Sequence, residues 1–378
     1  MLTVTVHSAY KEIAPEAWDA VVGDSSPFLE WRWLNALEES ECVAMSEGWL
    51  SRPIVVRRDG QIVAAAPAYI KSHSMGEFVY DWAWAHAARQ MGESYYPKLI
   101  VGVPFSPVTG HRLLIAPGED PAPLRELLIG GLIELARRHR CAGVHVLFDT
   151  AEEAAALEEL GGLTRLQTQS HWTDTGYGDF DGFLAAFESK RRRALRRERR
   201  RLAEVPGLEV QVLLGEQIRP EHLLAMERFY LNTSARFGGF DYLKSGLWRW
   251  MGEGFRDRLV LVLALLEGEP VAGALDVRGG DRLYGRYWGA DVEIPFLHFE
   301  VCYYKAIEWA LQNGVRVFEP GHGGEHKKPR GFRPTLCYSN HWILTPKLAR
   351  SVAEFLPRER AAVLAHLEEQ EDESPLRG

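Results

Sequence analysis

Cysteine is scarce in this sequence, and none is placed where a metal site or a disulfide framework would need it. The four cysteines, Cys42, Cys141, Cys302 and Cys337, stand alone, with neither a CxxC pair nor a histidine at metal-ligand spacing. This argues against the common zinc patterns and against a disulfide-rich scaffold. We therefore expect a cytoplasmic protein without a metal site.

Long apolar segments are missing as well. No run approaches the ~20 residues of a membrane-spanning helix, and the longest, residues 259–266, has the length of a buried strand. The first residues do not show a basic segment followed by an apolar one, so we expect no signal peptide. The remaining composition is that of a globular protein, and 378 residues are enough for two domains with their own cores.

Positive charge is scarce overall but concentrated in one place. The net charge is −8, yet residues 190–201 hold nine basic residues and one acid, which leaves 35 basic and 51 acidic residues elsewhere. Arginine favours bidentate contacts with phosphate. The sequence predicts a phosphate-rich donor bound by Arg191, Arg192, Arg193, Arg196 and Arg197. The alternative is a solvated helix face that pairs with the protein's own acids.

Two segments predict β-hairpins of the same kind. Residues 54–69 and 262–277 each consist of an apolar strand, a short turn and a strand rich in small residues. The turns contain Asp59-Gly60 and Glu267-Gly268, and an acidic residue followed by glycine favours a tight hairpin. The first part of the chain is therefore echoed in the second.

A second echo follows each hairpin. Residues 132–146 and 306–317 each predict an amphipathic helix, a glycine and a short strand. Gly143 and Gly314 fit a helix C-cap in the left-handed region. A repeat of this size indicates a duplicated domain rather than a solenoid.

The domain boundaries follow from this repeat. We expect a first domain over residues 1–178 and a second over 179–346, with the seam in a Gly- and Asp-rich stretch. The second domain is expected to open with one basic helix over 182–204. Residues 347–378 are expected to form a short C-terminal helix and a frayed acidic tail.

The two halves resemble tandem domains of the GCN5-related N-acetyltransferase (GNAT) fold. The chain is similar to predicted N-acyltransferases grouped with the Fem-type (FemAB-like) peptidoglycan aminoacyltransferases. Five segments carry the resemblance: FSPVTGHRLL (105–114), SKRRRALRRERR (189–200), LYGRYWG (283–289), LHFEVCYYKAIEWA (297–310) and FEPGHGGEHKKPRGF (318–332). The resemblance implies an α/β fold of two tandem GNAT-type domains, each a mixed twisted sheet flanked by helices. It also implies an N-acyltransferase that acts on an amine, as Fem-type enzymes do with aminoacyl-tRNA and a cell-wall precursor.

The loop that binds acetyl-CoA in many GNAT enzymes is not recognisable. Those enzymes hold the CoA pyrophosphate in a Q/R-x-x-G-x-G/A loop at a helix N-terminus. The equivalent stretches, 289–300 and 116–126, lack this pattern, and Pro295 removes an N–H donor. We expect no tightly bound cofactor and favour aminoacyl-tRNA over acyl-CoA as co-substrate. An acyl-CoA-dependent acetyltransferase is the alternative.

Two titratable residues lie at the predicted start of the helix after strand 283–289. Direct acyl transfer needs a deprotonated amine and a stabilised oxyanion. His298 has a side chain suited to a base near neutral pH, and Glu300 would act as a base or bind a cationic amine. The alternative is that Glu300 only favours the first turn of the helix. Tyr287, Trp288 and Tyr304 are expected in a substrate groove.

The glycine-rich segment 318–332 holds most of the remaining candidates. In Fem-type enzymes a lysine shortly before an aromatic–glycine pair polarises the acyl carbonyl, and Lys327 or Lys328 resembles it. Here the pair is Gly331-Phe332, in the reverse order. The resemblance therefore assigns one of these lysines to the oxyanion.

The other polar residues of this segment are expected around the substrate. Glu325 is a further candidate for the amine, and His322, His326 and Arg330 are expected in the groove. His322 and His326 lie four residues apart, but the glycines around them argue against a helix, so we predict no metal ion.

The residues leave the acceptor open between a peptidoglycan precursor, a peptide and a small amine, with tRNA as an expected partner. A non-catalytic double domain that binds RNA or a precursor is the alternative to an enzyme. Loss of turnover without loss of binding, when the lysines are replaced, separates the two.

Overall fold

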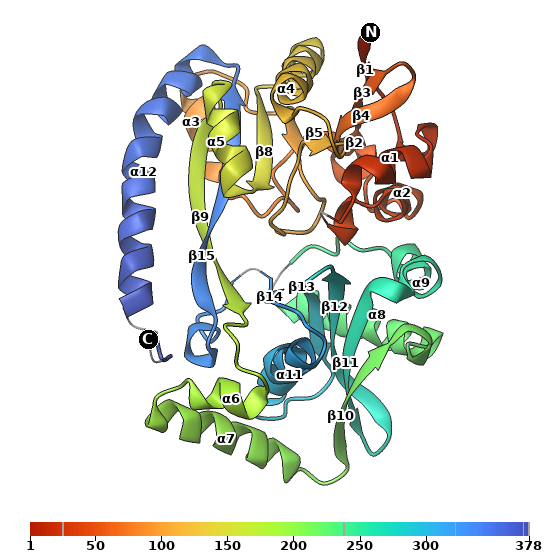
Figure 1. Ribbon diagram of the computed structural model, residues 1–378, viewed down its shortest axis with the longest axis vertical. Coiled ribbons are helices and arrows are strands. Elements are labelled where there is room, and N and C mark those ends of the chain that lie inside the picture. The colour runs from red at the N-terminus through yellow and green to blue at the C-terminus, as the bar shows by residue number, and fades with distance from the viewer. Residues whose placement is uncertain (25, 237–238, 322, 373, 377–378) are drawn as a thin grey trace. The chain divides into compact units, whose positions relative to one another are not determined.

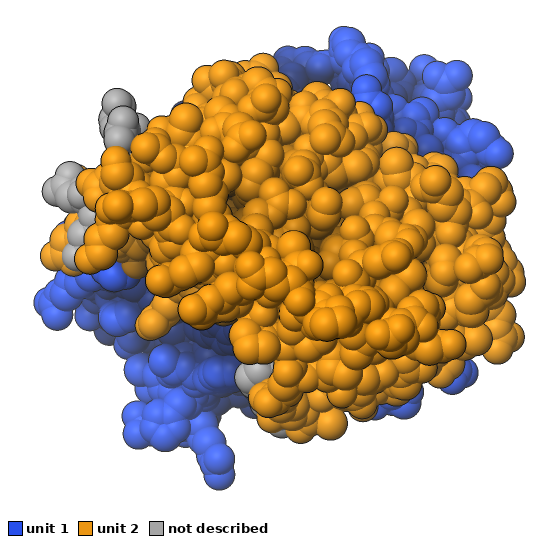
Figure 2. Space-filling view, turned by 90° about the horizontal axis from the view of Figure 1, so that it is seen from below, with its two compact units in different colours: residues 1–168, 336–366 blue, residues 169–335, 367–378 orange. Residues whose placement is uncertain are grey.

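The computed structural model describes the chain except for residues 25, 237–238, 322, 373 and 377–378. It forms two compact units, residues 1–168 with 336–366 (unit 1) and residues 169–335 with 367–378 (unit 2) (Figures 1 and 2). The chain passes between them within β9 (Leu163–Thr173), β15 (Arg333–Ile343) and α12 (Pro346–Asp372). These units differ from the division expected at residue 178, because β9 and β15 each supply residues to both. The duplicated-domain boundaries stay a prediction.

Unit 1 contains, besides parts of those elements, eight strands and five α-helices among its described residues. They are β1 (Leu2–Val6), α1 (Pro15–Val22), α2 (Trp31–Glu39), β2 (Trp49–Ser51), β3 (Ile54–Arg58), β4 (Gln61–Ala66), β5 (Ala68–Lys71), α3 (Trp82–Gln90), β6 (Lys98–Val101), β7 (Leu114–Ile115), α4 (Pro121–Arg138), β8 (Gly143–Asp149) and α5 (Ala151–Glu159). One set of strands is antiparallel in the order β1-β3-β4-β7. The other has the order β15-β8-β6-β5-β2, with β6 and β8 parallel.

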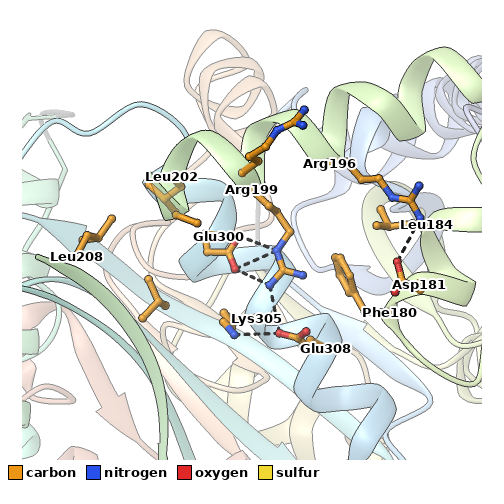
Figure 3. Close-up of a pocket in the computed structure, with 13 residues that line it drawn as sticks. Phe180, Asp181, Leu184, Arg196, Arg199, Leu202, Leu208, Glu300, Lys305 and Glu308 are labelled. Carbon is orange, nitrogen blue, oxygen red and sulfur yellow. Dashed lines mark hydrogen bonds and ion pairs between the residues drawn. The ribbon is translucent and has the colours of Figure 1, made fainter. Parts of the chain in front are cut away.

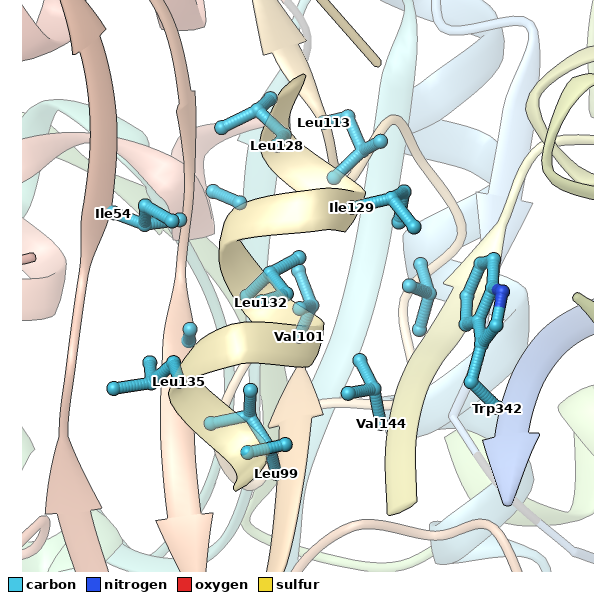
Figure 4. Close-up of a cluster of buried hydrophobic side chains, with 14 of the residues drawn as sticks. Ile54, Leu99, Val101, Leu113, Leu128, Ile129, Leu132, Leu135, Val144 and Trp342 are labelled. Carbon is cyan, nitrogen blue, oxygen red and sulfur yellow. The ribbon is translucent and has the colours of Figure 1, made fainter. Parts of the chain in front are cut away.

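The core of unit 1 lies between α4 and the strands that it covers (Figure 4). Leu128, Leu132 and Leu135 recur on one side of α4 at helical spacing. They belong to one buried cluster with Val101 of β6 and Val144 of β8. Each buried leucine contributes roughly 1.5–3 kcal/mol relative to an exposed one, so this packing fixes α4 on the sheet.

Unit 2 is built around strands in the order β10-β11-β12-β13-β14-β9. Its elements are α6 (Phe180–Ala185), α7 (Ser189–Ala203), β10 (Leu208–Leu214), α8 (Pro220–Arg236), α9 (Ser245–Gly254), β11 (Leu259–Leu266), β12 (Glu269–Gly279), β13 (Arg282–Ala290), α10 (Leu297–Phe299), α11 (Lys305–Gln312) and β14 (Val317–Glu319). Only β13 and β14 pair in parallel in this order. Residues 300–304 form a π-helix that joins α10 to α11.

Both predicted hairpins are confirmed. In β3–β4 the turn residues Asp59 and Gly60 have φ of 50° and 89°, and in β11–β12 Glu267 and Gly268 have φ of 52° and 85°. Positive φ at both central positions is the turn geometry that matches the twist of paired strands. The acidic–Gly signal therefore identified the turn geometry as well as its position.

The two predicted glycine caps have different outcomes. Gly314 follows α11 with φ of 68°, as predicted. Gly143 is instead the first residue of β8, and the left-handed position after α4 is taken by Arg140, with φ of 53°. A Cβ on Gly143 would lie 2.8 Å from the carbonyl oxygen of Trp342. Glycine is thus required there by the close approach of β15.

The single helix predicted over 182–204 is wrong, because the chain breaks between α6 and α7. Asp179 caps α6 by accepting a hydrogen bond from the Gly182 N–H at 2.8 Å. Phe187 is fully buried, and its backbone forms a β-bridge with Leu376 in place of helical pairing. The helical spacing of the apolar residues continues across this break, so periodicity alone did not reveal it.

The C-terminal helix is longer than expected. α12 extends from Pro346 to Asp372 and includes Pro357, and Leu348, Val352 and Leu356 bury its first turns in unit 1. After it, the backbone of Glu188 donates to the carbonyl of Pro375 at 3.2 Å. The described part of the tail is therefore held rather than frayed. In the portion of the chain that the structure describes, no helix has the length and apolarity needed to cross a membrane.

Two buried histidines make the stability of unit 1 dependent on pH. His145 of β8 and His341 of β15 face each other with their Nδ1 atoms 2.8 Å apart, and neither Nε2 has a partner among the described residues. Burial is the main cause that lowers the pKa of His145 to about 3, and the positive charge of Lys98 is the second. Burial also lowers the pKa of His341 well below its usual value, with His145 as the second cause. Both are therefore neutral in the folded protein.

We expect the free energy of unfolding to fall as the pH drops below about 6.5, since the unfolded chain then binds protons that the folded pair does not. The loss approaches about 1.4 kcal/mol per pH unit for each histidine. Burial raises the pKa of Glu77 to about 7, which acts in the opposite direction. Urea titrations of the wild type and of a His145→Gln/His341→Gln variant at several pH values isolate the histidines. An equally steep fall in the variant contradicts this account.

Candidate active site

A cavity of about 270 Å³ opens in unit 2 beside the β12–β13 pair. We call it the reaction cavity. Strands, the helical segment 297–304 and the loop after β14 contribute its lining: Ala274, Asp276, Gly285, Arg286, Tyr287, Trp288, His298, Cys302, Tyr303, Pro320, Gly321, Gly323, Gly324, His326 and Lys327.

A β-bulge shapes the strand wall of this cavity. Leu275 pairs with Tyr287 and Asp276 pairs with Gly285, so Arg286 is an extra residue on β13. Bulges re-aim side chains and occur often beside active sites. A Cβ on Gly285 would lie 3.1 Å from the Cα of Pro320 and 3.3 Å from Asp276 Oδ1. Glycine therefore lets the strand, the acid and the loop come together.

Asp276 is the residue that sequence reasoning missed. Its side chain is 2% exposed, and its Oδ2 has no hydrogen-bond partner among the described residues. Burial raises its pKa well above the usual value. The available signal was an acidic residue within an otherwise apolar strand, which is costly unless the site uses it.

Lys327 provides a buried amine to the reaction cavity, which the guanidinium of Arg286 also lines. It is 3% exposed, and its Nζ donates to the carbonyl of Gly321 at 2.6 Å. Burial lowers the pKa of its amine to about 8, partly opposed by Cys302. The cavity thus contains one buried amine that is mostly protonated at neutral pH and one buried carboxyl.

Aromatic and imidazole rings form another wall. The His298 ring lies edge-on to Trp288, Tyr303 and His326, with centroids 4.9, 5.3 and 5.1 Å away. His326 Nε2 lies 3.1 Å from the Tyr303 hydroxyl. Burial, followed by the charge of His326, lowers the pKa of His298 to about 4. His298 is therefore neutral and serves better as a wall or hydrogen-bond partner than as a base at neutral pH.

A buried ion pair supports the loop that carries Lys327. Arg330 donates to Glu198 at 2.8 Å, to the Tyr304 hydroxyl at 2.9 Å and to the carbonyl of His326 at 2.9 Å. Its guanidinium lies 3.2 Å from the centroid of the Phe299 ring. Such a network holds the loop in one conformation. Arg330 and Tyr304 do not line the reaction cavity, and their expected place in a substrate groove remains a prediction.

Three of the predicted catalytic residues lie elsewhere. Glu300 faces α7, where Arg199 donates to its two oxygens at 2.7 and 3.0 Å. Glu325 is exposed and Lys328 is half-exposed, and neither lines the reaction cavity. Their predicted roles are not tested by this placement.

The other sequence predictions can be placed more simply. Lys327, His298, Tyr287, Trp288 and His326 all line the reaction cavity. His322 lies outside the described residues. The structure thus brings five of the predicted residues together with Asp276.

α7 divides its basic residues between the interior and the surface. Arg191 donates to the carbonyl of Pro329, and Arg192 to that of Ala185 at 3.3 Å. These two are engaged by the backbone and partly buried, unlike the freely presented phosphate ligands that the sequence predicted. An exposed row remains, which we call the basic face: Lys190, Arg193, Arg196, Arg197, Arg200 and Arg201.

The basic face has little acidic compensation. Among the described residues, only Arg196 of this row forms an ion pair, with Asp181 at 3.3 Å, and both side chains are more than half exposed. An exposed pair of this kind is weak. The face is thus available to a polyanion.

A family model described as FemAB-like, peptidoglycan biosynthesis/recognition, matches residues 9–378. The chain belongs to the FemAB-like family. Two solved structures share the fold of this FemAB-like chain. FemX is 15% identical, with a TM-score of 0.53 over 93% of this chain and 100% of its own. L-PGS from Bacillus licheniformis is 13% identical, with a TM-score of 0.53 over 91% of this chain and 97% of its own.

A tandem GNAT protein from the clavulanic acid biosynthesis pathway is 12% identical, with a TM-score of 0.48 over 90% of this chain and 98% of its own. No curated protein matches the sequence. The predicted family and the α/β tandem GNAT fold are confirmed. Family membership supports a peptidoglycan-related acyl- or aminoacyltransferase.

Proposed function

We propose that this FemAB-like protein transfers an aminoacyl group from a charged tRNA to an amine of a peptidoglycan precursor, by direct attack in the reaction cavity. One observation carries the proposal: a buried lysine and a buried carboxyl with an unpartnered oxygen line the same cavity. Paired groups whose environments shift them away from their usual pKa are typical of acid–base sites.

Lys327 is assigned to the acyl carbonyl. Because its pKa is about 8, the ammonium form predominates at neutral pH. A buried positive charge stabilises the oxyanion of the tetrahedral intermediate more than the neutral carbonyl. The hydrogen bond to Gly321 fixes the position of Nζ before substrate arrives. Lys327 thereby lowers the barrier for attack.

Asp276 is assigned to the attacking amine. An acceptor ammonium that enters the cavity gives its proton to the Asp276 carboxylate, because burial makes this carboxylate a stronger base than usual. The neutral amine then attacks the carbonyl carbon, and the C–N bond forms. As the intermediate collapses, the C–O bond to the tRNA ribose breaks, and the ribose oxygen takes the proton that the amide nitrogen loses. No covalent enzyme intermediate is needed.

The basic face supports a tRNA donor over a small one. Its residues follow one side of α7 at spacings of three and four, so a row of cations about 15 Å long faces outward. A phosphate backbone matches such a row, whereas a small donor with two or three phosphates occupies only part of it. Contacts of this type are salt-sensitive and independent of sequence.

Removing three of these charges is expected to weaken tRNA binding and its dependence on salt. For Lys190→Gln/Arg193→Gln/Arg197→Gln, we expect the slope of log K against log salt to decrease in magnitude by about 2 between about 50 and 200 mM salt. Filter retention of labelled bulk tRNA measures this. An Arg89→Gln/Arg137→Gln/Arg350→Gln variant loses the same charge from exposed positions of unit 1. Equal slopes in the two variants, or no retention by the wild type, argue against a tRNA donor.

A further inference from the structure

A second cavity in unit 2, of about 570 Å³, shares no residue with the reaction cavity. We call it the α7 pocket (Figure 3). It lies among α6, α7, β10 and the helical segment 300–308. That segment contributes to both cavities: Glu300 lines the α7 pocket, whereas Cys302 and Tyr303 line the reaction cavity.

Arg199 presents a fixed cationic plane in this pocket. It contacts Glu300 through two nitrogens and Glu308 at 3.2 Å, and Lys305 holds Glu308 from the other side at 3.1 Å. The guanidinium lies 4.5 Å from the centroid of the Phe180 ring. Carboxylates contact its edges and Phe180 faces one of its flat surfaces, so a planar ligand would stack on the other surface.

The opposite wall of the pocket is apolar. Leu202 of α7 and Leu208 and Val210 of β10 line it, and the two β10 residues keep part of their surface exposed. A flat apolar ligand that stacks on the guanidinium therefore meets hydrocarbon on its other side. This combination of a planar cation, an aromatic ring and an apolar wall is how proteins hold unpaired nucleobases.

The α7 pocket and the basic face are continuous. Arg196 and Arg200 belong to the basic face and also line the pocket, and Arg200 forms no ion pair with a described residue. A phosphate bound by Arg196 or Arg200 would therefore lie beside the α7 pocket. Charge complementarity selects an anionic ligand, and the interior selects a flat, apolar one.

We infer that the α7 pocket binds one unpaired nucleotide of the acyl donor, with its base between Arg199 and the Leu208 side and its phosphates on Arg196 and Arg200. This inference rests on the proposed function, since the donor supplies the nucleotide. A single-stranded stretch of tRNA and the nucleotide part of CoA share this chemistry. The pocket therefore adds a recognition element that an uninterrupted RNA duplex would not satisfy.

The test fills the pocket from an exposed position. Ala203 is exposed and lines the pocket, so Ala203→Trp occupies it, whereas Ala185→Trp makes the same change at an exposed α6 position outside the pocket. Leu208→Glu is a second variant, which places a negative charge on the apolar wall. Fluorescence anisotropy measures the affinity for a labelled single-stranded RNA octamer, for an RNA duplex of the same length, and for labelled CoA.

We expect Ala203→Trp and Leu208→Glu to weaken single-strand binding about tenfold, with little change for the duplex and none for Ala185→Trp. Loss of CoA binding with unchanged RNA binding would assign the nucleotide to CoA. If the wild type binds RNA, and both pocket variants bind RNA and CoA as tightly as the wild type does, the pocket inference fails. The tRNA proposal then stands. If the wild type binds neither ligand, both fail.

Discussion

Replacing Lys327 with methionine is expected to lower the rate of acyl transfer by about 10²- to 10³-fold, the usual effect of losing one oxyanion-stabilising group. Substrate affinity is expected to change little, because the ammonium acts mainly on the charge that develops during attack. Single-turnover transfer at saturating substrate measures this effect. The pH profile adds a second readout: since the pKa of Lys327 is about 8, the wild-type rate falls as the pH rises through that value.

Lys328→Met is the matched control, because Lys328 is the neighbouring residue but does not line the reaction cavity. Its rate is expected to stay near that of the wild type. Lys327→Arg keeps a charge at alkaline pH, so any activity that it retains is expected without the fall above pH 8. A normal rate in Lys327→Met, or the larger loss in Lys328→Met, contradicts the assignment.

Asp276→Asn is expected to lower the transfer rate by about 10²- to 10⁴-fold, because an amide cannot accept the proton of the attacking ammonium. The fold is expected to tolerate the change, since asparagine has nearly the same shape as the aspartate that it replaces at this buried position. Transfer kinetics and thermal unfolding of the same preparation separate the two effects.

Glu325→Gln provides the comparison for Asp276→Asn. Glu325 is a base candidate from the sequence, but it is exposed and does not line the reaction cavity. Its replacement is expected to leave the rate within about twofold of the wild type, as is usual for surface positions away from a site. A large loss in Glu325→Gln together with an active Asp276→Asn would reverse the assignment.

Local signals in the sequence predicted the fold well where the chemistry was local. The turns at Asp59-Gly60 and Glu267-Gly268 depend on a backbone geometry that glycine permits, and both formed as predicted. The prediction of a helix cap at Gly143 was wrong, because glycine is needed there to let β15 approach closely, about 200 residues away in the chain. The break at Phe187 also depends on a distant partner, Leu376. Long-range contacts of this kind produce no periodic pattern in the sequence.

The candidate site shows the same division. Lys327 was found through the resemblance to Fem-type enzymes, and His298 because it lies at the predicted start of a helix that follows a strand. Asp276 lies inside a strand, and its importance depends on burial and on the bulge opposite it. Glu300 appeared equally promising at a helix start, but Arg199 engages its carboxylate. Which acid is left unpaired is a property of the folded chain.

The most direct test of the central claim follows the acyl group itself. The protein is mixed with tRNA charged with radiolabelled amino acids and a peptidoglycan precursor that bears a free amine, with labelled acetyl-CoA in a parallel reaction. The account predicts that label leaves tRNA and appears in an amide of the precursor, and that Lys327→Met slows this step. Transfer from acetyl-CoA while the tRNA stays charged would contradict it.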